Sequence, residues 1–258
     1  LANRYNKQGK KVMLCAADTF RAGAIEQLKV WGERLGCEVV VGKENSDPAS
    51  VAFEGAKKAK ENNVDFILAV GGGSVIDSAK LIASGVYYDG DAFDFNRHIS
   101  KPTKALPIGV ILTIASAGSE ASNSCVIQND KLHIKSGFNN DVIRPCFAIE
   151  DPTLSFGVSK YQTAVGIADT IMHSLERLIN ESDSYGLADK LAVDVITTTM
   201  ESGLKCLENP TDYDARANLM LCSSLSHNGL TAVGKTSQFH VHPIEHGLSG
   251  YNPNIVHG

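Results

Sequence analysis

The chain has 258 residues, a formal net charge of −5 and six cysteines, and these values exclude several classes of protein. A chain of this length can bury a sizeable core as one large domain or two smaller ones. The acidic balance argues against nucleic acid or an anionic membrane as the main partner, because either would favour a basic surface. The cysteines are scattered singly without a C-x-x-C pair, which is typical of reduced thiols in a cytoplasmic protein. No apolar run approaches the roughly 20 residues that span a bilayer.

The first half of the chain alternates apolar, strand-like runs with runs of helical periodicity. Apolar segments predict strands at residues 11–17, 38–41, 65–70 and 107–114, with shorter pieces at 125–127 and 146–149. Helical patterns lie between them at residues 22–35, 47–62 and 74–84. This order is typical of a doubly wound parallel sheet, and it predicts an α/β nucleotide-binding domain over residues 1–157.

A glycine run at residues 71–80, GGGSVIDSAK, joins the third predicted strand to the helix that follows it. Without Cβ atoms the backbone can approach a pyrophosphate closely, and the free N–H groups at the start of the helix face the anion. The spacing matches neither G-x-G-x-x-G nor a Walker loop, so a tight turn without a ligand is the alternative. A second turn of small residues, ASAGSE at 115–120, could also bring donors to a nucleotide.

Beyond about residue 160 the apolar pattern becomes helical throughout. Helices are expected at residues 161–179, 187–207, 213–230 and 239–248. The sequence therefore predicts an all-helical second domain over residues 158–258.

Five side chains of this helical half have the spacing of a metal site. Asp169 and His173 lie four residues apart, as do His242 and His246, so each pair leaves one face of a helix. His257 follows after a loop. One carboxylate with three imidazoles suits Fe(II) or Zn(II) and leaves a position for a substrate oxygen, while an incidental histidine-rich surface is the alternative. The solitary histidines are expected to be structural: His98, His133 and His227.

Six motifs from about residue 66 onwards resemble the iron-containing alcohol dehydrogenases, especially their butanol dehydrogenase-like branch. They are LAVGGGSVID at 68–77, LPIG at 106–109, AGSE at 117–120, GIAD at 166–169 followed by His173, YDARANLM at 213–220 and IEHGLS at 244–249. The resemblance implies a nicotinamide cofactor, NAD(P), whose pyrophosphate lies on residues 71–74. The family continues past the position of Gly258 with further helices, so the resemblance also implies a truncated helical domain with exposed apolar surface.

The resemblance and the motifs together give the candidate site residues. The implied metal ligands are Asp169, His173, His242 and His257, with His246 beside the metal as the catalytic residue for proton transfer. The expected cofactor-binding residues are Gly71, Gly72, Gly73, Ser74, Asp77, Thr113, Ser116 and Lys135.

Residues 1–65 resemble a different family, the GTPase domain of the signal-recognition-particle receptor. The matching segments are LANRY at 1–5, DTFRAGAIEQL at 18–28, VWGER at 30–34 and DPASVAF at 47–53. The chain lacks a P-loop to hold the β- and γ-phosphates, so Asp18 and Arg21 have no nucleotide to act on and we do not expect GTP hydrolysis. The two resemblances predict a chimera, in which the opening strand–helix–strand–helix unit of one α/β fold replaces that of another.

Taken together, the sequence predicts a metal-dependent, NAD(P)-linked alcohol dehydrogenase or aldehyde reductase that acts on a small alcohol or aldehyde. We expect no nucleic-acid or membrane partner, and the formation of a homodimer is left open. Two alternatives are a GTP-binding fragment of the receptor type and an inactive chimera of the two families.

Overall fold

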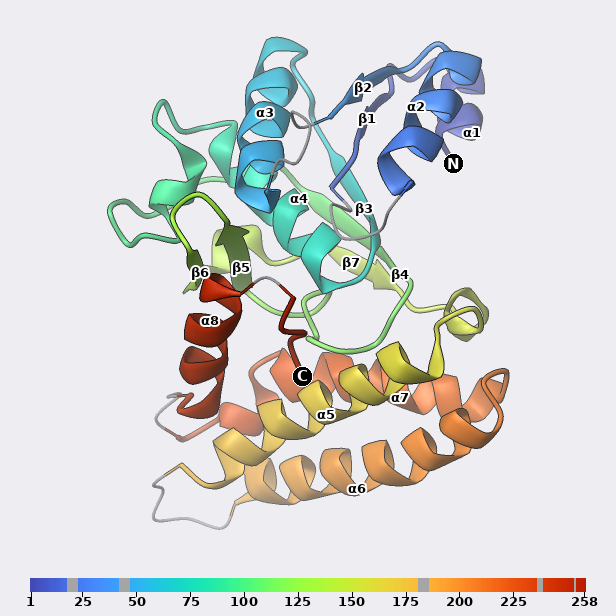
Figure 1. Cartoon of the computed structure of the whole chain (residues 1–258), viewed down its shortest axis with the longest axis vertical. Coiled ribbons are helices and arrows are strands. Elements are labelled where there is room, and N and C mark those ends of the chain that lie inside the picture. Colours follow the sequence, from blue (N-terminus) through green and yellow to red (C-terminus); the bar gives the residue numbers. More distant parts are fainter. Residues whose placement is uncertain (18–22, 42–46, 181–185, 236–238, 253) are drawn as a thin grey trace.

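The computed structural model describes residues 1–17, 23–41, 47–180, 186–235, 239–252 and 254–258. An α/β half is stacked on a layer of long helices, and the C-terminus lies between the two (Figure 1). Within the described ranges no helix has both the length and the apolar character to cross a bilayer.

Three parallel strands form the central sheet of the α/β half. Strand β3 (Ile67–Gly71) pairs with β4 (Ile108–Leu112), which pairs with β7 (Phe147–Ile149). Two more strands, β1 (Met13–Cys15) and β2 (Glu38–Val40), pair in parallel as a separate sheet. The α/β class and the parallel pairing are as predicted, but the expected single sheet is divided among the described residues. Each strand of the separate pair has three residues and offers few ladder bonds to a further neighbour.

Four helices accompany these strands: α1 (Ala2–Lys7), α2 (Ala24–Leu35), α3 (Pro48–Glu61) and α4 (Gly73–Gly85). Helix α3 begins where the sequence predicts, because the Asp47 carboxylate accepts the Ser50 N–H at 2.7 Å. Helices α3 and α4 pack together, and the apolar core between α4 and the central sheet includes fully buried aliphatic side chains. Among them are Ile76, Leu81, Ile108, Val110 and Leu112.

An antiparallel hairpin of β5 (Ser124–Asn129) and β6 (Ile134–Asn139) lies beside α4. The sequence pattern predicts only the first of these strands. A fully buried lysine of α4, Lys80, fastens the hairpin to the helix, because its ammonium donates to Ser119 Oγ at 2.9 Å and to Ser124 O at 2.7 Å. A buried ammonium needs several acceptors in this way to offset its lost hydration.

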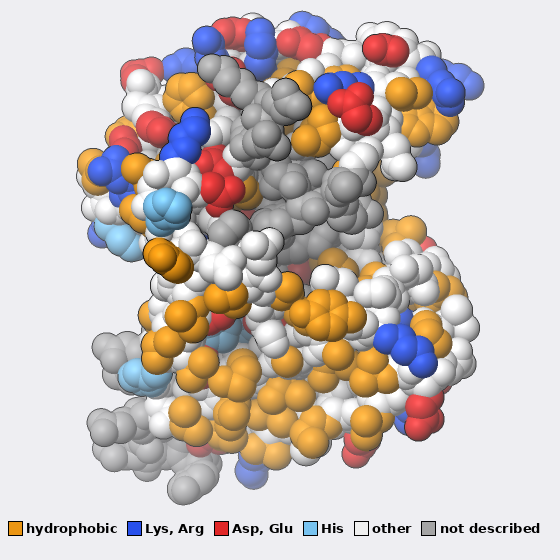
Figure 2. Space-filling view, viewed as in Figure 1, with side chains coloured by type: hydrophobic (Ala, Val, Ile, Leu, Met, Phe, Trp, Pro, Cys, Tyr) orange, Lys and Arg blue, Asp and Glu red, His pale blue; other side chains and the backbone are white. Residues whose placement is uncertain are grey.

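The second half is helical, as predicted, with α5 (Lys160–Leu178), α6 (Leu187–Glu208), α7 (Tyr213–His227) and α8 (Val241–Tyr251). Apolar side chains gather over this half of the face in Figure 2. Large apolar side chains at least 44 % exposed are frequent on α6 and α8: Leu187, Val193, Met200, Leu204, Val241, Ile244, Leu248 and Tyr251. Short 3₁₀ turns complete the elements, at Ala92–Asp94, Asp141–Ile143, Pro152–Ser155 and Leu230–Ala232.

The loop after β4, residues 113–121, joins the two halves of the molecule. The carbonyl oxygen of Ser116 accepts the hydroxyl of Thr170 on α5 at 3.0 Å and that of Ser223 on α7 at 3.1 Å. Gly166 of α5 lies against the same loop, since a Cβ at this glycine would stand 2.2 Å from the carbonyl oxygen of Ala115. The close approach of helix and loop therefore requires glycine.

We expect Gly166→Ala to lower the free energy of unfolding by about 3 kcal/mol, because helix α5 must move away from the loop backbone. Thermal unfolding measures this change. Gly157→Ala is the matched control, since its Cβ meets no atom within 4 Å. Equal melting temperatures of the two variants would contradict the close contact.

A buried carboxyl group, Glu120, lies at the same junction. Its Oε1 and the Oε1 of Glu150 each lie 2.7 Å from the hydroxyl of Ser224 on α7. Burial raises the pKa of Glu120 to about 7, and the bond from Ser224 offsets only part of that rise. The folded protein therefore holds Glu120 mainly in its neutral form below about pH 7.

This junction should weaken as the pH rises. The pKa of Glu120 is raised from 4.5, so its contribution to stability is fully present below pH 4.5 and is lost as the pH rises through 7. The loss amounts to about 3 kcal/mol at most. Glu120→Gln, which stays neutral, should flatten the fall of melting temperature between pH 5 and pH 8, whereas Glu201→Gln on the exposed face of α6 should not. A profile for Glu120→Gln as steep as the wild type's would refute the assignment.

Candidate metal centre

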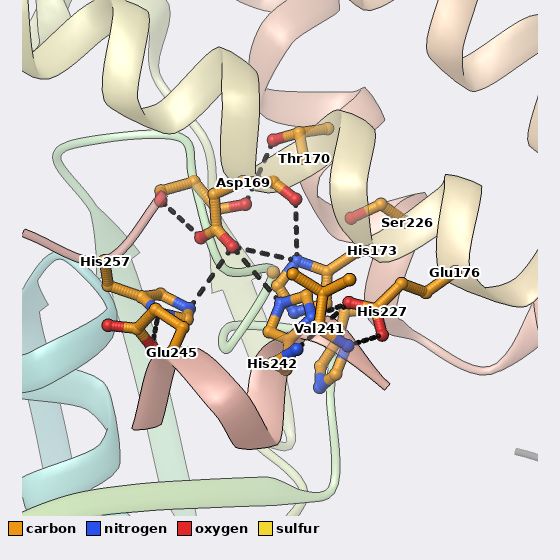
Figure 3. A network of polar contacts seen from close by, with 12 residues as sticks. Asp169, Thr170, His173, Glu176, Ser226, His227, Val241, His242, Glu245 and His257 are labelled. Atoms are coloured by element: carbon orange, nitrogen blue, oxygen red, sulfur yellow. Dashed lines mark hydrogen bonds and ion pairs between the residues drawn. The ribbon is translucent and has the colours of Figure 1, made fainter. Parts of the chain in front are cut away.

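One face of α5 supplies the first part of the candidate site. Asp169, His173 and Glu176 follow each other at helical spacing, and all three are buried. Helix α8 brings His242 to this face, and the chain after α8 returns with His257. In Figure 3 the three imidazoles point toward the Asp169 carboxylate from α5, α8 and the C-terminal tail. The structure thus brings the four predicted metal ligands together.

The two oxygen atoms of the Asp169 carboxylate lie in different environments. Its Oδ2 accepts the hydroxyl of Ser116 at 2.7 Å. Its Oδ1 is buried and accepts no hydrogen bond, although three imidazole nitrogens surround it. These are His173 Nδ1 at 3.2 Å, His242 Nε2 at 3.6 Å and His257 Nε2 at 3.3 Å.

This donor set fits a divalent transition-metal ion. A buried carboxylate oxygen without a hydrogen bond is costly unless a cation or another donor compensates it. The ligand atoms of Asp169, His173 and His242 all lie within 4.8 Å of one another. Imidazole nitrogens with one carboxylate are the ligands that zinc and non-haem iron favour.

The electrostatics keep this carboxylate ionised. Burial acts to raise the pKa of Asp169, but His173, His242 and His257 outweigh it and hold the pKa of the carboxyl well below its usual range. Burial also lowers the pKa of His173, although the charge of Asp169 acts to raise it. The lowered pKa favours a neutral imidazole at His173. An ionised carboxylate and a neutral imidazole are the protonation states that metal binding needs.

Two glutamates outside the predicted set contact the Nδ1 atoms of two of the imidazoles, on the ring side away from Asp169. Glu176 accepts His242 Nδ1, and Glu245 Oε2 lies 2.5 Å from His257 Nδ1. Burial acts to raise the pKa of Glu176, but the bonds from His242 and from the backbone of α8 lower it. The sequence contains no local signal for these contacts, because Glu176 contacts His242 on another helix and Glu245 contacts His257, twelve residues further along the chain.

A second group of potential ligands, Glu245, His246 and His257, lies beside the first. The ammonium of Lys135 already donates to both oxygens of Glu245, at 3.1 and 3.2 Å. A metal ion on Glu245 would have to compete with that ammonium, so the geometry favours the group around Asp169.

His246 and His227 each lie next to an imidazole of the candidate centre. His246 lies on α8 one turn after His242, with its ring centroid 5.5 Å from that of His257. Burial, followed by the charge of Lys135, lowers the pKa of His246 to about 4. His227, expected to stand alone, packs edge-on against His173 with the ring centroids 4.4 Å apart. His227 Nδ1 also lies 3.0 Å from a guanidinium nitrogen of Arg177.

The predicted cofactor-binding residues divide into two groups. Those of the glycine turn lie at the carboxyl end of β3, where Thr113 N donates to Gly71 O at 3.1 Å and so places the two predicted turns side by side. Gly73 begins α4, and a Cβ at this glycine would meet only Ala117 Cβ, at 3.4 Å. The turn residues are Gly71, Gly72, Gly73, Ser74 and Thr113.

The other three have polar groups bonded within the protein. Asp77 accepts Ser119 Oγ at 2.5 Å and Val126 N at 2.9 Å, so both of its oxygens are used. Lys135 is bonded to Glu245, as described, and also to Ser249 Oγ at 3.0 Å. Ser116 donates to Asp169. The Ser116 loop therefore connects the glycine turn directly to the candidate metal centre.

Comparison with protein families finds two matches that together cover most of the chain. The family model described as iron-containing alcohol dehydrogenase matches residues 1–152. The model described as the C-terminal part of the Fe-containing alcohol dehydrogenase family matches residues 163–258.

The similar proteins include dehydrogenases and reductases. NADH-dependent butanol dehydrogenase A of Clostridium acetobutylicum is 43% identical over 84% of this chain and 56% of its own length. An NADPH-dependent aldehyde reductase of Escherichia coli is 30% identical over 90% of this chain and 62% of its own. The crystal structure of NADH-dependent butanol dehydrogenase A from Thermotoga maritima superimposes with a TM-score of 0.80 and 33% identity, over 98% of this chain and 65% of that one. The chain thus spans between about half and two thirds of the length of these relatives.

The first 65 residues lie inside the first of these matches, because the dehydrogenase model starts at residue 1. The comparisons give no support for a segment of the receptor GTPase type or for a chimera. Asp18 and Arg21, the residues singled out in that segment, lie outside the described residues.

Proposed function

This chain belongs to the iron-containing alcohol dehydrogenase family, and we propose that it is a metal-dependent, NAD(P)-linked alcohol dehydrogenase or aldehyde reductase. The observation that carries the proposal is the Asp169 Oδ1 atom, which is buried without a hydrogen bond amid three imidazole nitrogens. The connection of this centre to the glycine turn through the Ser116 loop supports the presence of a nicotinamide cofactor and a metal in one site.

The proposed metal is Fe(II) or Zn(II), held by Asp169, His173, His242 and His257. The proposed cofactor is NAD(H) or NADP(H), with its pyrophosphate on residues 71–74 at the N-terminus of α4. The names of the relatives support both forms, since one is NADH-dependent and another NADPH-dependent. When bound, the metal would supply Lewis acidity toward a substrate oxygen and the nicotinamide a hydride.

The side chains of the chain itself have distinct roles in this proposal. Asp169 contributes the negative charge of the ligand set, and Ser116 holds it by donating to Oδ2. Asp77 holds the helix that follows the glycine turn in place, because its bonds to Ser119 and Val126 fix α4 against the loop after β4 and the hairpin. Lys135 acts through Glu245, which in turn holds His257. These residues position the site and need not touch the substrate.

His246 is the proposed proton carrier between the site and solvent. Its side chain keeps about a fifth of its surface exposed (18 %), whereas His173 (5 %) and His242 (8 %) are closed off. It lies next to the ligand set, with its ring centroid 6.2 Å from that of His242. A neutral imidazole in this position can pass a proton between substrate and water.

The remaining parts of the proposal concern the domain boundary, the substrate and the cellular location. We propose a division into domains at residues 157 and 158, a small alcohol or aldehyde as substrate, and a cytoplasmic location, which the free thiols of all six cysteines support. Formation of a homodimer stays a prediction.

Oxidation of NADH or NADPH by the purified chain with butyraldehyde tests the proposed function. Activity that needs added Fe(II) or Zn(II) is the expected result. If neither cofactor is oxidised with either metal, while NADH still binds, the chain is an inactive nucleotide-binding protein.

A further inference from the structure

A single buried carboxylate, Glu176, contacts both the imidazole of His242 and the start of the helix that carries it. Glu176 lies on α5 and has no exposed surface. Its Oε2 accepts the backbone N–H groups of His240 at 2.5 Å and Val241 at 2.8 Å. Its Oε1 accepts the N–H of His242 at 3.3 Å and also contacts His242 Nδ1. Figure 3 shows Glu176 reaching from α5 to Val241 and His242.

These bonds cap α8 from outside the helix. The residue before α8, His240, makes no side-chain capping bond, so the first N–H groups of the helix need another acceptor. A carboxylate at this end also interacts favourably with the helix dipole. Because α8 carries His242, Glu245 and His246, the position of Glu176 fixes the placement of the whole helix over the Asp169 carboxylate.

The same carboxylate selects the tautomer of His242. An ionised carboxylate can only accept, so the bonded Nδ1 atom must carry the proton. Nε2 then bears a lone pair, and Nε2 is the atom that faces Asp169 Oδ1 at 3.6 Å. Two lone-pair atoms that face each other without a proton between them repel, unless a cation lies between them. The tautomer set by Glu176 is therefore the one that binds metal.

We propose that Glu176 is a positioning residue of the metal centre, which caps α8 and holds His242 as its Nδ1–H tautomer so that Nε2 is free to bind the ion. This inference rests on the metal site of the proposed function. Glu245 stands in the same relation to His257, and the two glutamates come from different helices, so each imidazole is held by a segment other than its own.

Two measurements on the full chain test the proposal. The first uses the metal-free wild type, in which long-range ¹H–¹⁵N spectra of labelled histidine report the tautomer, with His242 assigned by the loss of its signals in His242→Ala. The Nδ1–H form is the expected result. The Nε2–H form in the wild type would overturn the proposal even if the protein binds metal.

The second measurement is the affinity for Zn(II) alone, by competition with a chromophoric chelator. Glu176→Gln keeps the shape but places an NH₂ group against N–H donors, so we expect about 10- to 100-fold weaker binding and a shift of His242 toward the Nε2–H form. Glu176→Asp retains the charge on a shorter chain and serves if the glutamine variant does not fold. It should bind Zn(II) with an affinity between those of the other two.

Asp212→Ala is the matched control, because it removes a cap of α7 that accepts Ala215 N at 3.0 Å in the same helical half. It should lose stability but keep its affinity for Zn(II). An equal loss of affinity in Asp212→Ala, or an unchanged affinity in Glu176→Gln, overturns the proposal. A wild type that binds neither Zn(II) nor Fe(II) but holds His242 as Nδ1–H would instead contradict the proposed function, and only the capping of α8 and the tautomer assignment would stand.

Discussion

Asp169→Asn should abolish metal binding and lower kcat/KM for aldehyde reduction by about 10³-fold or more, since a metal site contributes several kcal/mol to such a reaction. The substitution keeps the size of the side chain but removes the one negative charge of the ligand set. The amide also brings two N–H donors to a position that three imidazole nitrogens already surround. Metal content after incubation with Fe(II) or Zn(II), followed by the rate of NAD(P)H oxidation, measures both effects.

Asp194→Asn provides the control for this variant. Asp194 lies on α6, is exposed and belongs to the same helical half, so its loss of charge should leave metal content and rate unchanged. If Asp169→Asn retains a full complement of metal and the wild-type rate, Asp169 is not a ligand.

Gly73→Asp should weaken the binding of NADH or NADPH by about 100-fold, which corresponds to about 2.7 kcal/mol. Gly73 is the first residue of α4, and a Cβ there has only an ordinary contact with Ala117. An aspartate in the first turn of a helix is favourable for the helix itself, so the fold should be retained. The new carboxylate, however, would occupy and repel the place where a pyrophosphate binds.

Gly73→Asn separates charge from size in this test. Asparagine has nearly the shape of aspartate but no charge, so it should weaken binding by about tenfold only. Fluorescence titration with NADH and NADPH gives both dissociation constants. Equal affinities for Gly73→Asp and the wild type would mean that no phosphate binds at this turn.

Helix ends and helix positions were predicted well, because capping residues and apolar periodicity are signals within the segment itself. Asp47 before Pro48 marked the start of α3, and Gly36, in a left-handed conformation, closes α2 as expected. The four long helices of the second half followed from apolar periodicity alone. Strand β6 was missed because Lys135 and Gly137 interrupt its apolar pattern, and its existence depends on pairing with β5.

The candidate site was only partly predictable for a similar reason. Two i, i+4 pairs could be read from the sequence, and the structure brings Asp169 and His242 within 3.6 Å across more than seventy residues. The contacts that support them could not be read. Glu176 has the appearance of a charge on the solvated face of a helix, yet it is fully buried. Ser116 was expected to face a nucleotide, and its hydroxyl instead bonds to Asp169. Such roles depend on tertiary distances, which spacing along the chain does not encode.

An anomalous difference map of crystals soaked with Zn(II) tests the metal centre most directly. We expect one strong peak per chain, bounded by the carboxylate of Asp169 and the imidazoles of His173, His242 and His257. A map with no peak there, or with a peak on Glu245 and His246 while Asp169 and His173 stay bare, would contradict it.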